Sequence, residues 1–325
     1  MGCMKDSLGR TIDYVRISVT DRCNLRCLYC MPEEGTQLFE HKEMLKLEEI
    51  TRICECMAAL GISRVKLTGG EPLVRRNIIW LTEMIAKIPG IRDVTMTSNG
   101  VLLKQSAAAL KAAGLSSINV SLDTLERSRF AMITRRDCYD QVLCGIAAAQ
   151  AAGLRVKINC AVTEHFRLTE VLEFAAFSIE NQIPVRFIEM MPIGMGQAFE
   201  TLDNDVLLKT LTLAYHDVAQ LERPLGNGPA VYYTFAGGKG CVGFISAVHH
   251  KFCDRCNRVR LTSDGYLKLC LARETGLSLR DVIRRGITDE ELTRIIVEMI
   301  RQKPASHQFG SGSRSQGITM NRIGG

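Results

Sequence analysis

Three cysteines, Cys23, Cys27 and Cys30, lie within eight residues at the spacing C-x3-C-x2-C. A structural zinc site normally takes four protein ligands, and disulfides use cysteines in pairs. Three clustered thiols therefore favour a metal centre that keeps one coordination position open. An iron-sulfur cluster in which one iron has no protein ligand fits this description.

A second triad, Cys253, Cys256 and Cys270, has the spacing C-x2-C-x13-C. Alone it resembles half of a zinc ribbon, but no further Cys or His follows Cys270 at ribbon spacing. His249 and His250 precede Cys253 and would complete a zinc site, so zinc remains an alternative. A second cluster with an open iron is the sharper hypothesis.

Two glycines follow a predicted strand in the tetrapeptide Gly69-Gly70-Glu71-Pro72. Backbone without side chains can approach a ligand closely and offer it N-H and C=O groups. A simple turn would use the same residues. Its position next to the cysteine loop favours a binding role for the tetrapeptide.

Basic residues recur within the predicted strands. Side chains of a strand alternate between its two faces, so Arg16, among Val15, Ile17 and Val19, is expected to point into the fold, as is Lys157. A buried charge needs a partner, and an anionic ligand such as a nucleotide triphosphate would supply it. The complete set at strand ends is Arg16, Lys66, Lys157, Arg186, Arg258 and Arg260.

The elements that would position these residues alternate along the first part of the chain. Apolar and β-branched runs predict strands at Tyr14–Val19, Arg64–Thr68, Asp93–Thr97, Ser117–Leu122, Arg155–Val162 and Val185–Glu189. Amphipathic patterns predict helices at Leu47–Leu60, Ile78–Ile88, Gln105–Ala113, Asp140–Ala152 and Thr169–Asn181. Repeated strand-helix units indicate a parallel sheet.

Six such units predict an α/β fold, a closed or partial (βα)6 TIM-like barrel over residues 1–190. The polar and glycine-rich residues follow the strands, where barrels of this kind place their active sites. After Met191 the pattern changes to short strands and helices, with a hairpin through Ser263-Asp264-Gly265. Residues 191–325 are expected to form a smaller C-terminal α+β domain that caps the barrel mouth.

Composition is that of an ordinary globular protein, with 46% hydrophobic and 23% charged residues. The net charge of +6 suits an anionic substrate but falls short of the dense basic tracts of nucleic-acid binders. The first ten residues are polar, and no apolar run approaches the roughly twenty residues that cross a bilayer. We therefore expect a cytoplasmic protein that binds neither membrane nor nucleic acid.

The first triad with an aromatic residue before its third cysteine, placed after the first strand and followed by Gly-Gly-Glu-Pro, resembles the radical S-adenosylmethionine (SAM) superfamily. The second triad, the segment Cys256–Arg260 and the terminal Gly324-Gly325 narrow the resemblance to the GTP 3′,8-cyclase family of molybdenum cofactor biosynthesis. The resemblance covers nearly the whole chain, from about Gly9 to Gly325.

The resemblance implies cofactors and site residues. Each triad would hold a [4Fe-4S] cluster, the first binding SAM and the second meeting the guanine of GTP. Tyr29, Gly70, Ser121 and Met191 would line the SAM pocket. The GTP contacts would be Arg16, Lys66, Thr97, Lys157, Arg258 and Arg260, with Lys66 standing where many relatives carry Arg. Arg186 would join the GTP contacts, and Arg186, Gly324 and Gly325 would take part in catalysis.

The implied reaction converts GTP to 3′,8-cyclo-7,8-dihydro-GTP through a 5′-deoxyadenosyl radical that removes hydrogen from ribose C3′. The implied partners are an electron donor protein and the downstream cyclic pyranopterin monophosphate synthase, and a homodimer is compatible with the family. Two alternatives remain. One is a radical SAM peptide-modifying enzyme with an auxiliary cluster, and the other is a zinc-bearing binding module.

Overall fold

The computed structural model describes residues 3–222, 225–307, 309 and 319–323. Its central strands are those that the sequence predicts, to within one residue at each end. They are β1 (Tyr14–Ser18), β2 (Arg64–Thr68), β3 (Asp93–Ser98), β4 (Ser117–Ser121), β5 (Arg155–Val162) and β6 (Val185–Glu189). Each pairs in parallel with the next in chain order. The predicted run of parallel strand-helix units is therefore confirmed.

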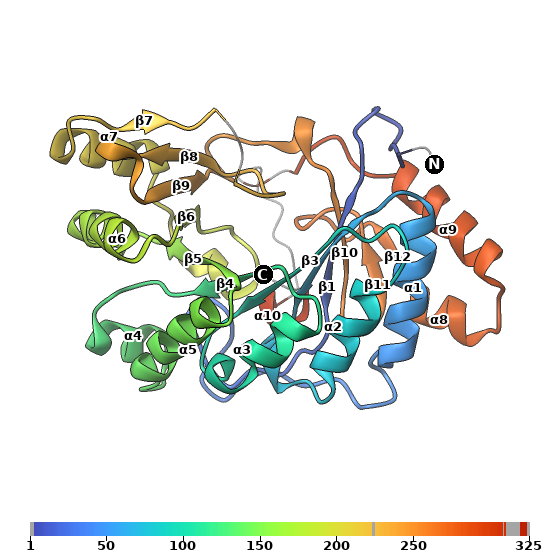
Figure 1. Cartoon of the computed structure of the whole chain (residues 1–325). Coiled ribbons are helices and arrows are strands. Elements are labelled where there is room, and N and C mark those ends of the chain that lie inside the picture. Colours follow the sequence, from blue (N-terminus) through green and yellow to red (C-terminus); the bar gives the residue numbers. More distant parts are fainter. Residues whose placement is uncertain (1–2, 223–224, 308, 310–318, 324–325) are drawn as a thin grey trace.

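Helices between these strands form an outer layer over the sheet (Figure 1). They are α1 (Leu47–Ala59), α2 (Ile78–Ala86), α3 (Leu103–Ala112), α4 (Arg127–Thr134), α5 (Tyr139–Ala151) and α6 (Leu168–Asn181). The sequence did not predict α4, which buries only Phe130 and Thr134 and so shows little amphipathic pattern. A short 3-10 helix, η1 (Pro72–Val74), follows β2.

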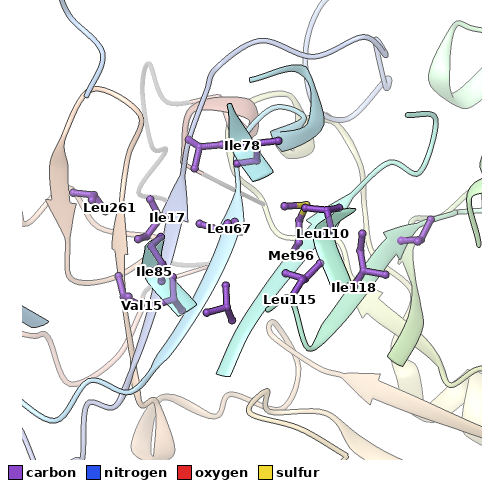
Figure 2. Packing of buried hydrophobic residues seen from close by; sticks show 14 of the residues in the cluster. Val15, Ile17, Leu67, Ile78, Ile85, Met96, Leu110, Leu115, Ile118 and Leu261 are labelled. Carbon is purple, nitrogen blue, oxygen red and sulfur yellow. The ribbon is translucent and has the colours of Figure 1, made fainter. Parts of the chain in front are cut away.

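The core lies between the sheet and this helical layer. Val15, Ile17, Leu67 and Ile118 are fully buried on their strands, and Ile85 of α2 is buried with them. Figure 2 shows these side chains packed together. Burying one such side chain contributes about 1.5–3 kcal/mol. The strand residues that face the helices thus anchor the sheet. Because side chains of a strand alternate, their neighbours in sequence face the other side of the sheet.

The chain beyond Met191 adds strands to both edges of this sheet. On the β6 side lie α7 (Asn204–Ala214), β7 (Ala219–Gln220), β8 (Val231–Thr234) and β9 (Cys241–Ile245). On the β1 side lie β10 (Arg258–Leu261), β11 (Tyr266–Lys268), β12 (Gly276–Ser278), α8 (Leu279–Arg284) and α9 (Asp289–Arg301). The strand order among the described residues is β12-β11-β10-β1-β2-β3-β4-β5-β6-β9-β8-β7.

Pairing at the two edges is specific. β9 runs parallel to β6 and β10 runs parallel to β1, whereas the outermost strands are antiparallel. The predicted hairpin through Ser263-Asp264-Gly265 joins β10 to β11, with Leu261 opposite Leu267. Further 3-10 helices are η2 (Gly194–Ala198), η3 (Ala236–Gly238) and η4 (Cys253–Arg255). One continuous sheet therefore contains both the predicted barrel and strands from the C-terminal region.

A last helix, α10 (Met320–Ile323), lies near the centre of the molecule, away from the outer layer (Figure 1). The helices of the described residues include none with the length and apolar character of a membrane span.

Candidate active site

Both cysteine triads face one cavity of about 310 Å³ at the carboxyl ends of the central strands. Its wall includes Cys23, Cys27, Cys30, Cys253, Cys256 and Cys270. The residues expected around SAM, Tyr29, Gly70, Ser121 and Met191, line the same cavity. Segments more than 200 residues apart in sequence thus meet, because β10 pairs with β1 and carries the second triad to the first.

The first triad lies in the loop after β1. The Sγ atom of Cys23 accepts hydrogen bonds from the Leu25 backbone N-H at 3.4 Å and from Asn99 Nδ2 at 3.8 Å. Burial raises the pKa of Cys23 to about 11 and that of Cys30 to about 12. These thiols are therefore neutral on their own, and a metal centre would hold them as thiolates because coordination deprotonates a thiol.

The spacing of the sulfurs bears on which metal centre fits. One tetrahedral zinc ion holds sulfur at about 2.3 Å, so all its ligand atoms lie close together. Within the described residues, the groups of three ligand atoms that all lie within 4.8 Å of one another contain carboxylates and histidines, and neither triad is among them. Three thiolates spread over separate irons of a cluster fit this wider arrangement better than a single ion does.

The second triad lies beside Lys303, which follows α9. The Nζ atom of Lys303 donates to the carbonyls of Arg258 at 2.9 Å and Leu269 at 2.6 Å. Burial favours the neutral thiol of Cys256, but Lys303 and Arg258 outweigh it and lower the pKa of this cysteine. The second triad is therefore set among positive charges.

His249 and His250 turn to carboxylates instead of the second triad. The Nδ1 atom of His249 lies 2.9 Å from Glu189 Oε1, and His250 Nε2 lies 3.1 Å from Asp205 Oδ2. Glu189 is fully buried and also accepts hydrogen bonds from the backbone N-H groups of Val248 and His249. The zinc alternative, which needed one of these histidines as fourth ligand, loses its support.

Gly69 and Gly70 allow two loops to touch. A Cβ on Gly69 would lie 2.6 Å from the Thr20 carbonyl oxygen, and one on Gly70 would lie 2.3 Å from that of Arg22. The Gly70 N-H donates to the Thr20 carbonyl at 2.7 Å. We expected these glycines to let a ligand approach the backbone. In the structure they let the backbone of the cysteine loop pack against them, and both glycines also border the cavity.

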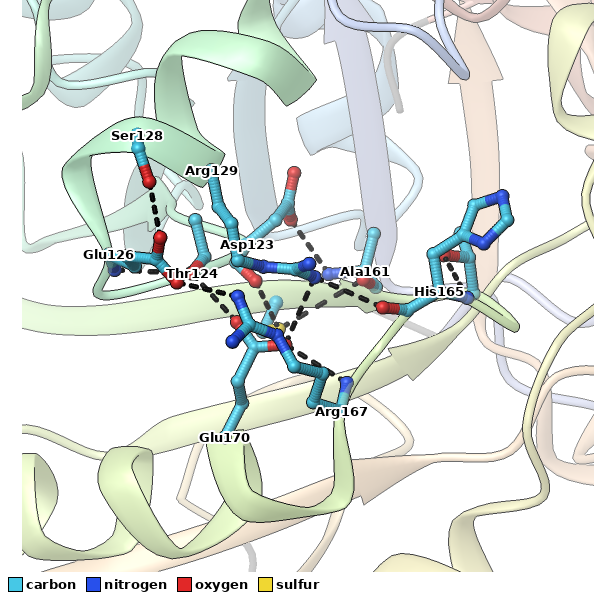
Figure 3. Close-up of polar contacts among 11 residues, drawn as sticks. Asp123, Thr124, Glu126, Ser128, Arg129, Ala161, His165, Arg167 and Glu170 are labelled. Atoms are coloured by element: carbon cyan, nitrogen blue, oxygen red, sulfur yellow. Dashed lines mark hydrogen bonds and ion pairs between the residues drawn. The ribbon is translucent and has the colours of Figure 1, made fainter.

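Asp123 ties the cysteine loop to the ends of two strands. Its carboxylate accepts hydrogen bonds from Tyr29 Oη at 2.6 Å and from the Ala161 N-H at 2.8 Å. Beside it, Glu170 of α6 accepts hydrogen bonds from Thr124 Oγ1 and Arg129 Nη2 (Figure 3). Burial raises the pKa of Asp123, and the hydrogen bonds from Tyr29 and Ala161 partly offset this rise. This network fixes the place of Tyr29 in the cavity wall.

A second cavity of about 380 Å³ adjoins the first, because Arg16, Thr97, Asn159 and Arg258 line both. Of the residues expected to bind GTP, Lys66, Lys157 and Arg186 line it as well, whereas Arg260 lines the first cavity. Burial and neighbouring cations lower the pKa of Lys157 to about 8 and hold that of Lys66 well below its usual range. The adjoining cavity is thus strongly cationic.

Arg186 is the clearest sign that this cationic cavity is built for an anion. The residue is 8% exposed, and its Nε and Nη2 atoms are buried without a hydrogen-bond partner among the described residues. Leaving donors of a buried charge unsatisfied costs about 1–3 kcal/mol or more. A planar guanidinium that lines the cavity suits an oxygen anion such as phosphate.

The C-terminal helix α10 closes part of the first cavity. Asn321 Nδ2 donates to the Asp21 carbonyl at 2.9 Å and to Thr36 Oγ1 at 3.1 Å. The guanidinium of Arg322 lies 4.5 Å from the centre of the Phe39 ring, and Arg260 Nη1 donates to the Ile323 carbonyl at 3.5 Å. Gly324 and Gly325, predicted to act in catalysis, lie outside the described residues.

Replacing Arg322 with alanine is expected to loosen α10, because it removes the stacking on Phe39 and a hydrogen bond to the Gln37 carbonyl. Together these contacts are worth about 1–2 kcal/mol. Hydrogen-deuterium exchange of residues 319–323 should therefore accelerate about tenfold. Arg285→Ala, at the exposed arginine that directly follows α8, is the control. Unchanged exchange in Arg322→Ala would show that this arginine does not hold the helix.

Several residues of the site were absent from the predicted set. Asn99, Asp123 and Glu189 stood in the strand-end segments that the sequence pointed to, but nothing distinguished them from their neighbours. Lys303 and Asn321 carried no sequence signal, because each reaches the site only through the packing of the C-terminal region. Long-range contacts of single polar side chains leave no local pattern.

Comparisons with known proteins agree with this geometry. Residues 17–177 match the family model of the radical SAM superfamily, and residues 183–309 match that of Molybdenum Cofactor Synthesis C. Among solved structures, Streptococcus suis SuiB bound to S-adenosylmethionine has a TM-score of 0.63 at 17% identity, covering 90% of this chain and 68% of that one. This likeness confirms the predicted fold class.

Curated relatives extend over almost the entire sequence. The GTP 3′,8-cyclase of Clostridium perfringens (strain 13) is 44% identical over 94% of this chain and 95% of its own length. That of Moorella thermoacetica is 43% identical over 99% of this chain and 100% of its own. This chain therefore belongs to the GTP 3′,8-cyclase family, within the radical SAM superfamily.

Proposed function

We propose that this protein is a lyase that converts GTP into 3′,8-cyclo-7,8-dihydro-GTP, the first step of molybdenum cofactor biosynthesis. The observation that carries the proposal is the pair of cysteine triads on one cavity wall, with a cationic cavity adjoining it. Membership of the GTP 3′,8-cyclase family supports the same reaction.

The first triad would hold one [4Fe-4S] cluster with SAM, and the second triad would hold another [4Fe-4S] cluster facing GTP. Bound there, the first cluster and SAM supply the 5′-deoxyadenosyl radical that removes hydrogen from C3′ of the ribose. Tyr29, Gly70, Ser121 and Met191 would position SAM against the first triad. Their place in the wall of one cavity supports these roles.

GTP would be held across the two cavities. Arg258 and Arg16 line both, so they would meet the nucleotide at the junction, while Lys66, Lys157 and Arg186 would neutralise its phosphates. Thr97 lines both cavities as well. Arg260 lines the first cavity and lies opposite Arg16 in the pairing of β10 with β1. The buried walls and α10 would keep water from the reacting atoms, which a carbon radical requires.

Gly324 and Gly325 would take part in catalysis; Ile323, which directly precedes them, is buried and accepts a hydrogen bond from Arg260. Each SAM cleavage consumes an electron, so an electron donor protein would be a partner. The product would be passed to cyclic pyranopterin monophosphate synthase. The homodimer and the cytoplasmic location remain predictions.

An anaerobic assay tests this function. The reconstituted protein is incubated with GTP, SAM and a chemical reductant, and the products are separated by chromatography and mass spectrometry. We expect 5′-deoxyadenosine and a cyclised GTP derivative in equal amounts. Formation of 5′-deoxyadenosine without any change in GTP would indicate another substrate, such as a peptide. Bound zinc without iron would contradict the proposed radical SAM activity.

A further inference from the structure

Residues Leu225–Pro229, a described part of the connection between β7 and β8, lie across one end of the cationic cavity. All five residues of this loop line that cavity, together with the first residues of β1 to β5. The Asn227 Nδ2 atom donates to Asp93 Oδ2, at the start of β3, at 2.8 Å. In the sheet, β4, β5, β6 and β9 separate β3 from β8, so this loop spans the amino ends of several strands.

This position is unusual for a barrel, where the amino ends of the strands normally serve stability and the carboxyl ends carry the site. Here the cavity continues to the amino ends, where Arg64, Asp93 and Arg155 border it. Asp93 is also the carboxylate that faces the buried cations Lys66 and Lys157. The loop is therefore bound to the acidic residue at the far end of the cationic cavity.

The loop backbone also touches a residue expected to bind phosphate. A Cβ on Gly226, whose φ is +140°, would lie 2.9 Å from Lys157 Nζ. A side chain there would therefore compete for the space of the ammonium group. An anion that pairs with Lys157 would lie against the backbone of this glycine, and Arg186 lines the same cavity.

We propose that residues Leu225–Pro229 form a lid over the polyphosphate end of the bound nucleotide, held closed by the hydrogen bond from Asn227 to Asp93. The inference rests on the proposed function, since it takes GTP as the ligand. It adds to that function a second mouth of the site, at the amino ends of the strands. The residues expected to bind SAM line the first cavity, so the phosphates would reach and leave their cations without passing SAM.

The proposal predicts that the lid acts through the outer phosphates. Asn227→Ala removes its hydrogen bond to a carboxylate, which is worth about 1.5 kcal/mol. We expect about tenfold weaker binding of GTP, a smaller loss for GDP and no loss for GMP. The loss should appear in the dissociation rate, because a lid retards escape. SAM affinity should not change.

The measurement is calorimetric titration of the anaerobically reconstituted protein, kept unreduced so that no turnover occurs, with competition experiments for the dissociation rate. Gly226→Ala is the second variant, since alanine rarely adopts a φ of +140° and its methyl group would meet Lys157 Nζ, so the loop is strained while the Asn227 side chain is kept. Asn181→Ala is the matched control, because it removes one hydrogen bond from an exposed asparagine on α6. Thermal unfolding verifies that each variant is folded.

The outcomes separate the two proposals. Unchanged GTP affinity in both variants, or an equal loss for GMP, GDP and GTP, would overturn the lid and leave the proposed function intact. No binding of GTP by the unaltered protein would overturn the proposed function, and the lid with it. A loss that grows with the number of phosphates, in both variants but not in Asn181→Ala, would support the lid.

Discussion

Replacing Cys253, Cys256 and Cys270 together with alanine is expected to halve the iron of the anaerobically reconstituted protein, from about eight to about four ions per chain. Cyclisation of GTP should fall below detection, because the group proposed to face the guanine is lost. Cleavage of SAM to 5′-deoxyadenosine should persist, since Cys23, Cys27 and Cys30 remain. Iron and sulfide analysis and product chromatography measure these three quantities.

The control is a triple variant of cysteines outside both triads. Cys3, Cys138 and Cys144 are each partly or fully exposed and none lines the cavity that holds the triads, so their alanine variant should retain all the iron. An iron content near eight ions per chain in the variant that lacks Cys253, Cys256 and Cys270 would contradict a second cluster at this triad. Loss of zinc with constant iron would identify the triad as a zinc site instead.

Arg186→Ala is expected to change nucleotide binding and stability in opposite directions. Among the described residues, the Nε and Nη2 atoms of the unaltered side chain are buried donors without a hydrogen-bond partner, and the side chain lies close to Lys66 and Lys157. Removing it relieves charge repulsion, so the ligand-free variant should melt at or above the temperature of the unaltered protein. GTP, however, loses a charge-assisted contact of about 1.5–3 kcal/mol, which weakens its binding about ten- to a hundredfold.

Differential scanning calorimetry and anaerobic titration with GTP measure the two effects. Arg294→Ala serves as the control, since this arginine is exposed on α9 and pairs only with Glu298 among the described residues. A lower melting temperature accompanied by unchanged GTP affinity would mean that Arg186 supports the fold and does not bind the nucleotide.

The central fold could be predicted because each strand carries its own signal. Runs such as Val185–Glu189 are apolar, β-rich and bounded by helical patterns, and the structure reproduces them almost residue for residue. α4 was missed because its buried face is small. The pairing of β10 with β1 was beyond local patterns, since Arg258–Leu261 reads as one basic strand whose partner lies near the other end of the chain.

In the candidate site, too, local sequence patterns could be predicted and long-range contacts could not. Cysteine spacing and charges on strands identified residues that the structure brings to two adjoining cavities. Polar side chains that act through a single long-range hydrogen bond were not identified. Lys303 illustrates why: its two acceptors, the carbonyls of Arg258 and Leu269, are backbone atoms that any residue would provide. Only the folded chain shows that a lysine reaches them.

The strands added at both edges of the sheet have a consequence for the growing polypeptide. β1 is among the first segments to leave the ribosome, yet its partner β10 is among the last, and Asn257 donates to Asp13 across 244 residues. Until then β1 presents an unpaired edge, which is prone to association with other chains. The cavity that joins the two triads therefore forms only when synthesis is nearly complete, so cluster insertion into a finished site comes late.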